Sequence, residues 1–437
     1  MTVPGGPQGL RWDATDLRRR LCHALEIAGK AVERLAEHGY SDAEEPANKV
    51  PREKIICETA ILLYAAATAD RHADTDAAIA AVARALIPHA RSKRMLLGIC
   101  LEPSLALDYA EAHICLSRLG YPDPGFDQVL RQARAAQAGF ARERVPHRVL
   151  EQRWIGGLWT DMPPGLPGPA SSTPVSVLNQ PLDVLNGSRE HVYAFTHALM
   201  YIRDFNIKPR RLPRSRAVML AEAEAALARC LDEDDYDLAG EVLMAWPLTG
   251  TSWSAAAAFG FRVLAKVEDE TGHLPAPSTR QDRLDKLEGA DRTNYWLATA
   301  YHTIYVMGLL CAAALQPARA PPVTLPRRPV KPETADAVLR FLDDDGRSPR
   351  WRHELERMSS QERAALAGFL FNVALIRKVQ RRDFGAVHDL LRTGYALGLA
   401  DGPASSQSAE MLERLATFEQ ITGSAGADLD WQPSTAR

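Results

Sequence analysis

Apolar residues recur every three to four positions along most of the chain, which is the pattern of amphipathic helices. Between residues 16 and 37, leucine, alanine and valine form one apolar stripe at positions 17, 21, 25, 28, 32 and 35. Further helices are predicted at residues 53–69, 76–86, 104–119, 126–141, 146–158, 189–205, 214–231, 238–246, 254–268 and 291–315, with several more near the C-terminus. The sequence lacks convincing runs of alternating polar and apolar residues, so it predicts an all-α protein.

Two proline-rich segments interrupt the helical pattern and indicate how the chain is organised. Residues 160–187 are longer than an ordinary helix connection, and we expect this loop to act as a lid that excludes water. Residues 316–332 carry six prolines and several arginines, which is typical of a semi-rigid linker. The pattern therefore predicts a helical domain at residues 1–315, a linker at 316–332 and a smaller helical module at 333–437.

One helix end favours a particular helical architecture. The helix over residues 254–268 leads into DETGHLP at residues 269–275, which is similar to the acidic-Gly-aromatic-Pro corner of α/α-toroid enzymes. An internal repeat of fixed length, which a solenoid would carry, is absent from the sequence. We therefore expect an α/α-toroid-like domain whose inner helices direct side chains toward a central cavity.

Composition narrows the function classes. The 437 residues are 46% hydrophobic, which is enough to bury a core, and the net charge of −3 argues against a generic binder of nucleic acid or membrane surfaces. No uninterrupted apolar run reaches the ~18 residues of a membrane span, and the N-terminus does not resemble a signal peptide. The six cysteines are scattered singly, as in a reduced protein. We predict a cytoplasmic protein with no nucleic-acid or membrane partner.

The segment SREHVYAFTHALMYIRDFNIKP holds the most informative polar residues. Ser188 is placed to cap a helix, and a seven-residue step returns to nearly the same helix face. Glu190, His197 and Asp204 should therefore share one stripe, with Tyr201 one turn after His197. In the last turn Asp204 would oppose the helix dipole, so we expect it to have a partner. The stripe is either a site or a face with a structural His–Asp hydrogen bond.

Two apolar helices also carry ionisable residues. Glu58 lies in KIICETAILLYAAA, where a buried carboxylate must be paired or protonated. Tyr295 and His302 share a face of NYWLATAYHTIYVMGLLCAA, a helix that Asp291 is placed to cap. For each, a structural hydrogen bond is the alternative to acid–base chemistry or metal binding.

Two charged groups have competing interpretations. Arg148 lies near Glu151 at a predicted helix start, and it forms either an interhelical ion pair or an anchor for an anionic substrate group. The acidic run LDEDDYD at residues 231–237 is similar to the Asp-x-Asp-Asp motif of class II terpene cyclases, but such runs are usually solvated loops.

The order of these motifs resembles an uncharacterised helical domain family common in actinobacteria. KIICETAILL, ERVPHRVLE, YAFTHALMYIRDF and AYHTIY follow one another between about residues 16 and 315, and members carry a Thr-His…Tyr…Asp-Phe motif and a later Tyr-His-Thr motif. The resemblance implies that Glu58, His197, Asp204 and His302 belong to one shared pattern, structural or catalytic. It brings no settled activity with it.

These observations predict an enzyme of specialised metabolism, such as antibiotic biosynthesis, that uses acid–base chemistry in a helical cavity. The reaction class is a cyclisation, elimination or hydrolysis of a small-molecule or peptide substrate. The expected catalytic residues are His197, Asp204, His302, Glu58 and Tyr201, and the expected substrate-binding residues are Arg148, Tyr295 and Glu190.

No cofactor motif is evident in the sequence. The sequence is compatible with a bound divalent metal, whose candidate ligands are His197, His302, Asp204 and Glu58. A homo-oligomer or a protein partner also remains open. The alternative function is a non-catalytic helical scaffold that binds a partner protein or peptide.

Overall fold

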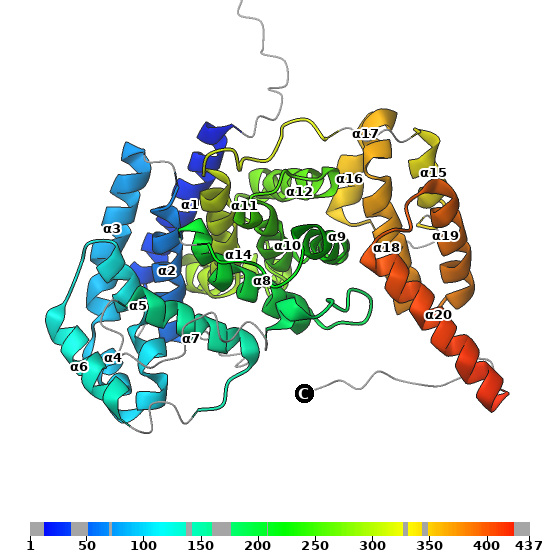
Figure 1. The fold of residues 1–437 in the computed structure, drawn as a ribbon. Coiled ribbons are helices and arrows are strands. Elements are labelled where there is room, and N and C mark those ends of the chain that lie inside the picture. Colours follow the sequence, from blue (N-terminus) through cyan, green and yellow to red (C-terminus); the bar gives the residue numbers. More distant parts are fainter. Residues whose placement is uncertain are drawn as a thin grey trace, which may run out of the picture.

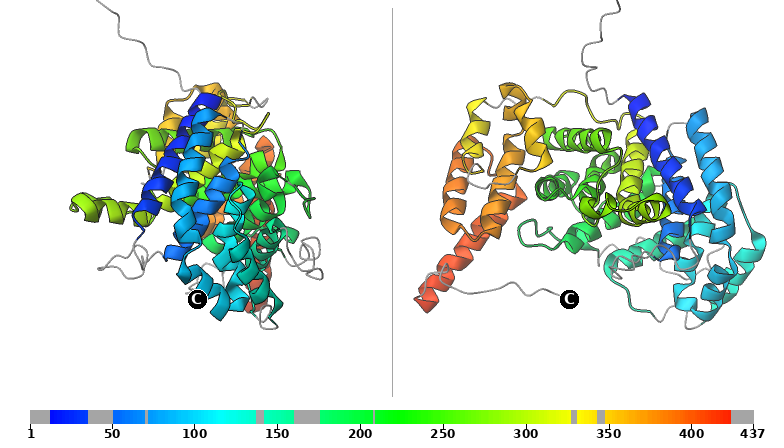
Figure 2. Two further views of the ribbon diagram at one scale, coloured as in Figure 1. Left: turned by 90° about the vertical axis from the view of Figure 1, so that its left-hand side faces the viewer. Right: turned by 180° about the vertical axis from the view of Figure 1, so that it is seen from behind.

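A computed structural model describes residues 13–35, 51–69, 72–136, 142–159, 176–207, 209–326, 331–342 and 348–423 of the protein. Every regular element within these ranges is a helix (Figures 1 and 2), which confirms the predicted all-α class. The part before the linker contains α1 (Ala14–Glu33), α2 (Arg52–Ala66), α3 (Ala73–Ala90), α4 (Lys93–Leu101), α5 (Ala106–Arg118), α6 (Pro124–Ala135), α7 (Pro146–Leu158), α8 (Arg189–Arg203), α9 (Arg216–Asp232), α10 (Tyr236–Leu243), α11 (Ala245–Thr249), α12 (Ala255–Thr271), α13 (Gln281–Leu284) and α14 (Gly289–Ala314).

Six of these helices form a closed ring. Along this ring α2 contacts α5, α5 contacts α7, α7 contacts α8, α8 contacts α10, α10 contacts α14, and α14 returns to α2. Outside the ring, α1 packs along α14 and α3, and α9 packs against α10 and α12. The ring positions side chains from distant parts of the sequence around one central space.

The longest helix of the ring, α14, is a buried core helix. With 26 residues, the helix is long and apolar enough to cross a membrane, yet 83% of its most apolar 18-residue stretch is buried inside the protein. Gly308 allows its close approach to α1, since a Cβ atom added there would lie 2.7 Å from the Cβ of Ala24. The apolar character of α14 is therefore accounted for by packing.

The end of α8 departs from the helical pattern. Ser188 caps its start, as predicted, and the Ser188 amide donates to Nδ1 of His191 at 3.3 Å. The helix ends at Arg203, and Asp204, Phe205 and Asn206 follow with φ of 45°, 46° and 68°. The prediction that Asp204 lies in the last helical turn is therefore wrong. Such left-handed residues cost about 1–3 kcal/mol each unless their surroundings hold them.

The C-terminal part packs against α9 and α12 of the preceding domain (Figure 1). It contains α15 (Glu333–Leu339), α16 (Arg350–Glu356), α17 (Ser360–Ala365), α18 (Ala367–Gln380), α19 (Phe384–Leu397) and α20 (Pro403–Thr422). Buried Arg377 of α18 donates from Nε to Oδ2 of Asp232 at 2.7 Å, and the indole of Trp351 donates to Oδ1 at 3.2 Å. An ion pair thus joins this part to the end of α9.

Two predicted features need correction or fall outside the described ranges. The helix around Tyr295 begins at Gly289 after Glu288, so Asp291 lies in its first turn and does not cap it. The short helices α4, α11 and α13 were not predicted. Of the expected lid, residues 160–175 lie outside the described residues.

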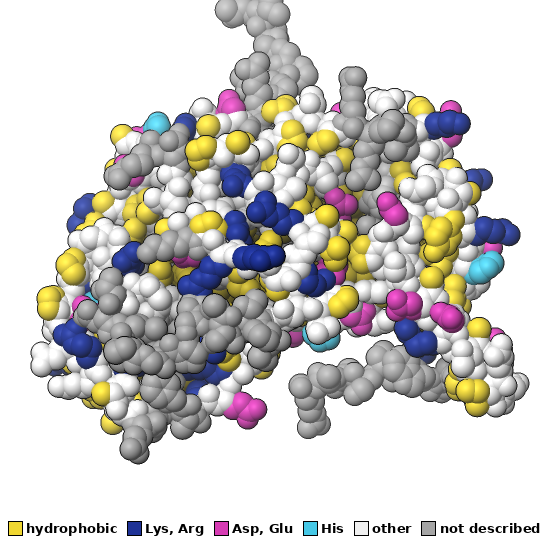
Figure 3. Space-filling model, in the orientation of Figure 1, with side chains coloured by type: hydrophobic (Ala, Val, Ile, Leu, Met, Phe, Trp, Pro, Cys, Tyr) yellow, Lys and Arg dark blue, Asp and Glu magenta, His cyan; other side chains and the backbone are white. Residues whose placement is uncertain are grey.

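The molecular surface carries both signs of charge. Figure 3 shows acidic and basic side chains spread over one face, with a group of Lys and Arg side chains near its middle. This mixture agrees with the small net charge of the whole chain.

Candidate functional site

A cavity of about 540 Å³ lies within the ring of helices. Every helix of the ring contributes to its wall, together with Arg94 of α4. Its described polar and aromatic lining residues are Glu53, Lys54, Cys57, Glu58, Arg94, Asp108, Tyr109, Glu111, Arg148, Glu151, Tyr193, His197, Tyr201, Phe205, Glu241, His302 and Tyr305. Its volume is within the range of pockets that bind small molecules.

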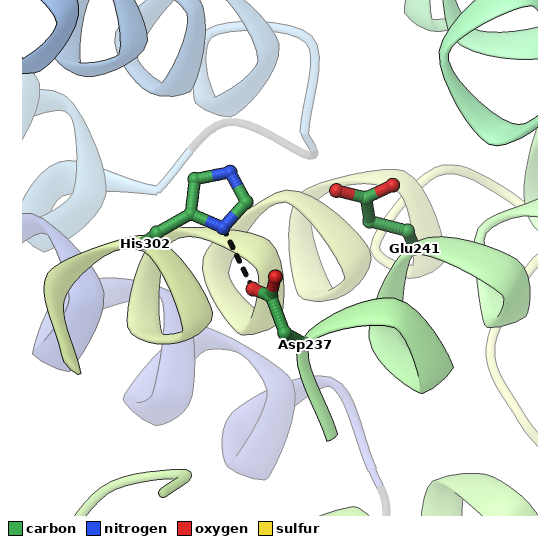
Figure 4. A group of neighbouring side chains, drawn as sticks. All are labelled: Asp237, Glu241 and His302. Atoms are coloured by element: carbon green, nitrogen blue, oxygen red, sulfur yellow. Dashed lines mark hydrogen bonds and ion pairs between the residues drawn. The ribbon is translucent and has the colours of Figure 1, made fainter. Parts of the chain in front are cut away.

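On the α14 side of the cavity, His302 lies between two carboxylates. Its Nδ1 is 2.7 Å from Oδ1 of Asp237 on α10, and its Nε2 is 3.7 Å from Oε1 of Glu58 on α2. Figure 4 shows the imidazole directed at Asp237. The hydroxyl of Tyr301 donates to the other oxygen of Glu58 at 2.6 Å. The geometry holds the ring in one orientation, with Nε2 on the cavity side.

The electrostatics of this group favour a protonated imidazole. Burial alone would lower the pKa of His302, but the charges of Asp237 and Glu58 outweigh it and raise that pKa to about 10. Burial would raise the pKa of Asp237, yet His302 and Arg189 hold it below its usual range. At neutral pH, both nitrogens of His302 therefore carry protons.

His197, on α8, faces the same cavity with a different carboxylate beside it. Its Nδ1 lies 3.1 Å from the carbonyl oxygen of Tyr193 and 3.4 Å from Oε2 of Glu241. Glu241 is buried, and its Oε2 accepts a hydrogen bond from the hydroxyl of Thr196 at 2.5 Å. The carboxylate next to His197 is therefore Glu241 and not Asp204.

A third charged group forms the α5–α7 wall. Arg148 donates from one nitrogen to both oxygens of Glu151 at 2.7 Å, and Tyr201 donates to Glu151 at 2.6 Å. Buried Glu111 lies on the same wall. The ion pair of Arg148 thus lies within α7 and is not the interhelical pair that the sequence suggested, and Arg148 also lines the cavity.

Three other predicted site residues lie outside the cavity. Oδ1 of Asp204 accepts from the indole of Trp154 at 2.7 Å and from the hydroxyl of Tyr64 at 3.1 Å, so the side chain fastens the left-handed turn after α8. The hydroxyl of Tyr295 accepts from the backbone amide of Arg280 at 3.1 Å. Glu190 is exposed on the first turn of α8. The structure brings together Glu58, His197, Tyr201, His302 and Arg148.

One group of described residues could hold a metal ion. Atoms of Asp237, Glu241 and His302 lie within 4.8 Å of one another, and Figure 4 shows the three side chains on α10 and α14. Asp237 already accepts hydrogen bonds from His302, Thr303 and Arg189. A metal ion would have to displace the proton between Asp237 and His302 and tolerate the cation of Arg189. Of the predicted metal ligands, this group contains His302 alone.

The sequence analysis missed Asp237, Glu241 and Glu111. Asp237 and Glu241 are four residues apart, which places them on one face of α10, but the acidic run before them was interpreted as a solvated loop. Glu111 lies in ALDYAEAHICL, a carboxylate among apolar residues like Glu58. The signal that selected Glu58 would have found Glu111 as well.

Comparison with known proteins gives the family of the chain and nothing more specific. Residues 23–312 match a family described as "Domain of unknown function (DUF6895)", so the chain belongs to that family. Searches of curated proteins and of solved structures gave no match. The matched region contains all the cavity residues and the ring of helices except the last two residues of α14.

Proposed function

We propose that this member of the DUF6895 family is a cytoplasmic enzyme that carries out acid–base chemistry in the ring cavity. Its substrate is a small molecule or a peptide segment, and its reaction is a cyclisation, elimination or hydrolysis. The closed ring of helices supports the α/α-toroid architecture expected from the sequence. A place in specialised metabolism is part of the same proposal.

The Asp237–His302–Glu58 arrangement carries this proposal. Three helices far apart in sequence place an imidazole between two carboxylates, at the wall of a cavity large enough for a substrate. Asp237 fixes the orientation of the ring through Nδ1, which leaves Nε2 to exchange a proton with a bound molecule. A histidine that served only to fill the core would not need a carboxylate next to each ring nitrogen, as His302 has.

The remaining cavity residues have roles that follow from their contacts. His302, with a proton on each nitrogen, supplies a group able to donate a proton, and His197 beside Glu241 supplies a group able to accept one. Tyr201, held by Glu151, lines the same cavity as the two histidines. Glu241 lies near both histidines, and two acid–base groups in one cavity suit reactions in which one proton is removed and another is delivered.

The test compares the wild type with Asp237→Asn and His302→Gln on a small-molecule extract of the native host. Mass spectrometry follows compounds whose loss depends on time and protein concentration. Glu33→Gln, which changes an exposed residue at the end of α1, is the matched control. We expect loss of turnover by roughly 100-fold or more in the two dyad variants and no loss in the control. Equal turnover in all four proteins would overturn the proposal.

Elemental analysis of the wild type, His302→Gln and a further variant, Glu241→Gln, decides whether a metal takes part. About one equivalent of metal that is lost in Glu241→Gln and His302→Gln would indicate metal-assisted chemistry at Asp237, Glu241 and His302. A protein purified without chelator that contains no metal would favour the Asp237–His302 pair acting alone. Co-purification of a stoichiometric protein partner, with no compound turned over, would favour the scaffold alternative.

A further inference from the structure

Glu111 is a buried carboxylic acid whose Oε1 makes no hydrogen bond to any described residue. The residue is 6% exposed, and it lines the cavity from α5. An unpartnered buried carboxyl oxygen costs about 1–3 kcal/mol or more. Such an atom at the wall of an open cavity indicates that its partner comes from a bound molecule.

Acidic residues outnumber basic residues around the cavity. The described lining residues include six acids and four bases: Glu53, Glu58, Asp108, Glu111, Glu151 and Glu241 against Lys54, Arg94, Arg148 and the protonated His302. Most of these carboxylates have a cationic partner, as in the pairs of Glu53 with Arg94, Asp108 with Arg144 and Glu151 with Arg148. Among the described residues, none forms an ion pair with Glu111.

The groups that face Glu111 from the elements around it explain its protonation. They are Cys57 on α2, Asp108 and Cys115 on α5, Arg148 and Glu151 on α7, and Tyr201 on α8. Burial, followed by the charges of Glu151 and Asp108, raises the pKa of Glu111 well above its ordinary value, and Arg148 offsets this only in part. Without a cation in the cavity, these surroundings therefore favour the protonated form of Glu111.

We infer that the cavity binds a substrate that carries a positively charged amine, with Glu111 as its counter-ion. This inference rests on the proposed function, since it names the substrate class for the same cavity. The amine would give Glu111 the charged donor that it lacks, and Glu111 would release its proton on binding. Tyr109, Tyr193, Tyr201, Phe205 and Tyr305 line the same space, and aromatic faces attract organic cations.

The binding test uses three probes of similar shape and different charge. They are 2-phenylethylammonium, the neutral 2-phenylethanol and the anionic 3-phenylpropionate, each titrated to millimolar concentration by calorimetry. We expect 2-phenylethylammonium to bind best, and its affinity to fall by roughly tenfold or more in Glu111→Gln. Glu33→Gln, the same change at an exposed site, should bind like the wild type.

A second measurement on the wild type alone keeps the inference testable if Glu111→Gln does not fold. Calorimetry in two buffers of different ionisation enthalpy counts the protons exchanged on binding. We expect release of about one proton per ammonium ion bound and none with the alcohol. Binding of the alcohol as tightly as the amine, preference for the carboxylate, absence of binding by the amine, or binding without proton release would each overturn the inference.

These experiments separate the inference from the proposed function. Amine binding does not depend on turnover, so loss of the inference leaves an acid–base enzyme with a different substrate. Conversely, amine binding that depends on Glu111, together with full turnover in His302→Gln, would retain the amine site and reject the Asp237–His302 pair.

Discussion

The ion pair between Arg377 and Asp232 gives the sharpest prediction about stability. Both side chains are buried, at 2% and 8% exposure, and the pair joins α18 of the C-terminal part to the end of α9. Replacing Arg377 with Met removes the guanidinium from the buried carboxylate of Asp232, which still accepts a hydrogen bond from the indole of Trp351. Removing one partner of a buried pair costs about 3–5 kcal/mol, so we expect the free energy of unfolding to fall by that amount.

The double variant Asp232→Leu/Arg377→Met tests the reasoning behind this magnitude. Because the loss arises from an uncompensated charge, removing both charges should restore most of the stability. Urea unfolding, followed by tryptophan fluorescence and circular dichroism, measures Arg377→Met, Asp232→Leu and the double variant against the wild type. A loss below about 1 kcal/mol in Arg377→Met would refute the argument, and so would a double variant whose loss equals the sum of the single losses.

Three further predictions rest on other buried groups. Arg20 is 1% exposed and pairs with Asp16, Glu268 and Asp269. Arg20→Met should lower the free energy of unfolding by about 3–5 kcal/mol in urea unfolding, and a loss under about 1 kcal/mol would contradict this. Gly308→Ala should destabilise the protein by about 1 kcal/mol or more, because the added methyl group would meet α1. Gly368→Ala, where the added methyl group meets no atom within 4 Å on α18, should stabilise it by about 0.5–1 kcal/mol. Thermal unfolding measures both, and equal shifts of the unfolding temperature would refute the difference. Folding raises the pKa of Glu111 from an ordinary value of 4.5, so the folded protein keeps a proton that the unfolded chain releases, and its stability falls as pH rises above that value. Glu111→Gln should therefore lose less stability as pH rises and be more stable than the wild type at pH 8. Urea unfolding across pH 4–9 measures this, and an unchanged slope of the free energy of unfolding against pH would contradict it.

Helical periodicity was sufficient to predict the all-α class and most of the longer helices. The helix predicted at residues 146–158 coincides with α7, since its apolar spacing and the proline at its start are both local signals. Short helices such as α4 and α11 carry too few turns for a periodic signal. The order of helices around the ring depends on contacts between distant segments, and a local pattern does not contain them.

The candidate site was predictable where a polar residue interrupts an apolar helix. Glu58 and His302 were found in this way, and the structure places them 3.7 Å apart. The prediction for Asp204 failed because it extended the helical period one residue too far, into a left-handed turn that no periodic pattern signals. Asp237 was missed because an acidic run looks solvated until the fold supplies Arg189 and His302 as partners.

The position of α14 in the ring has a consequence for how the protein is made. This helix is the last of the family domain in sequence, yet it closes the ring between α10 and α2 and covers α1. During synthesis, the apolar faces of α1 and α2 that contact α14 stay uncovered until about 250 further residues have been translated. At about 5–20 residues per second, this takes tens of seconds. During this interval the ring of helices is incomplete, and the apolar surface that α14 later covers is exposed. We therefore expect chaperones to bind the nascent chain most strongly at this stage.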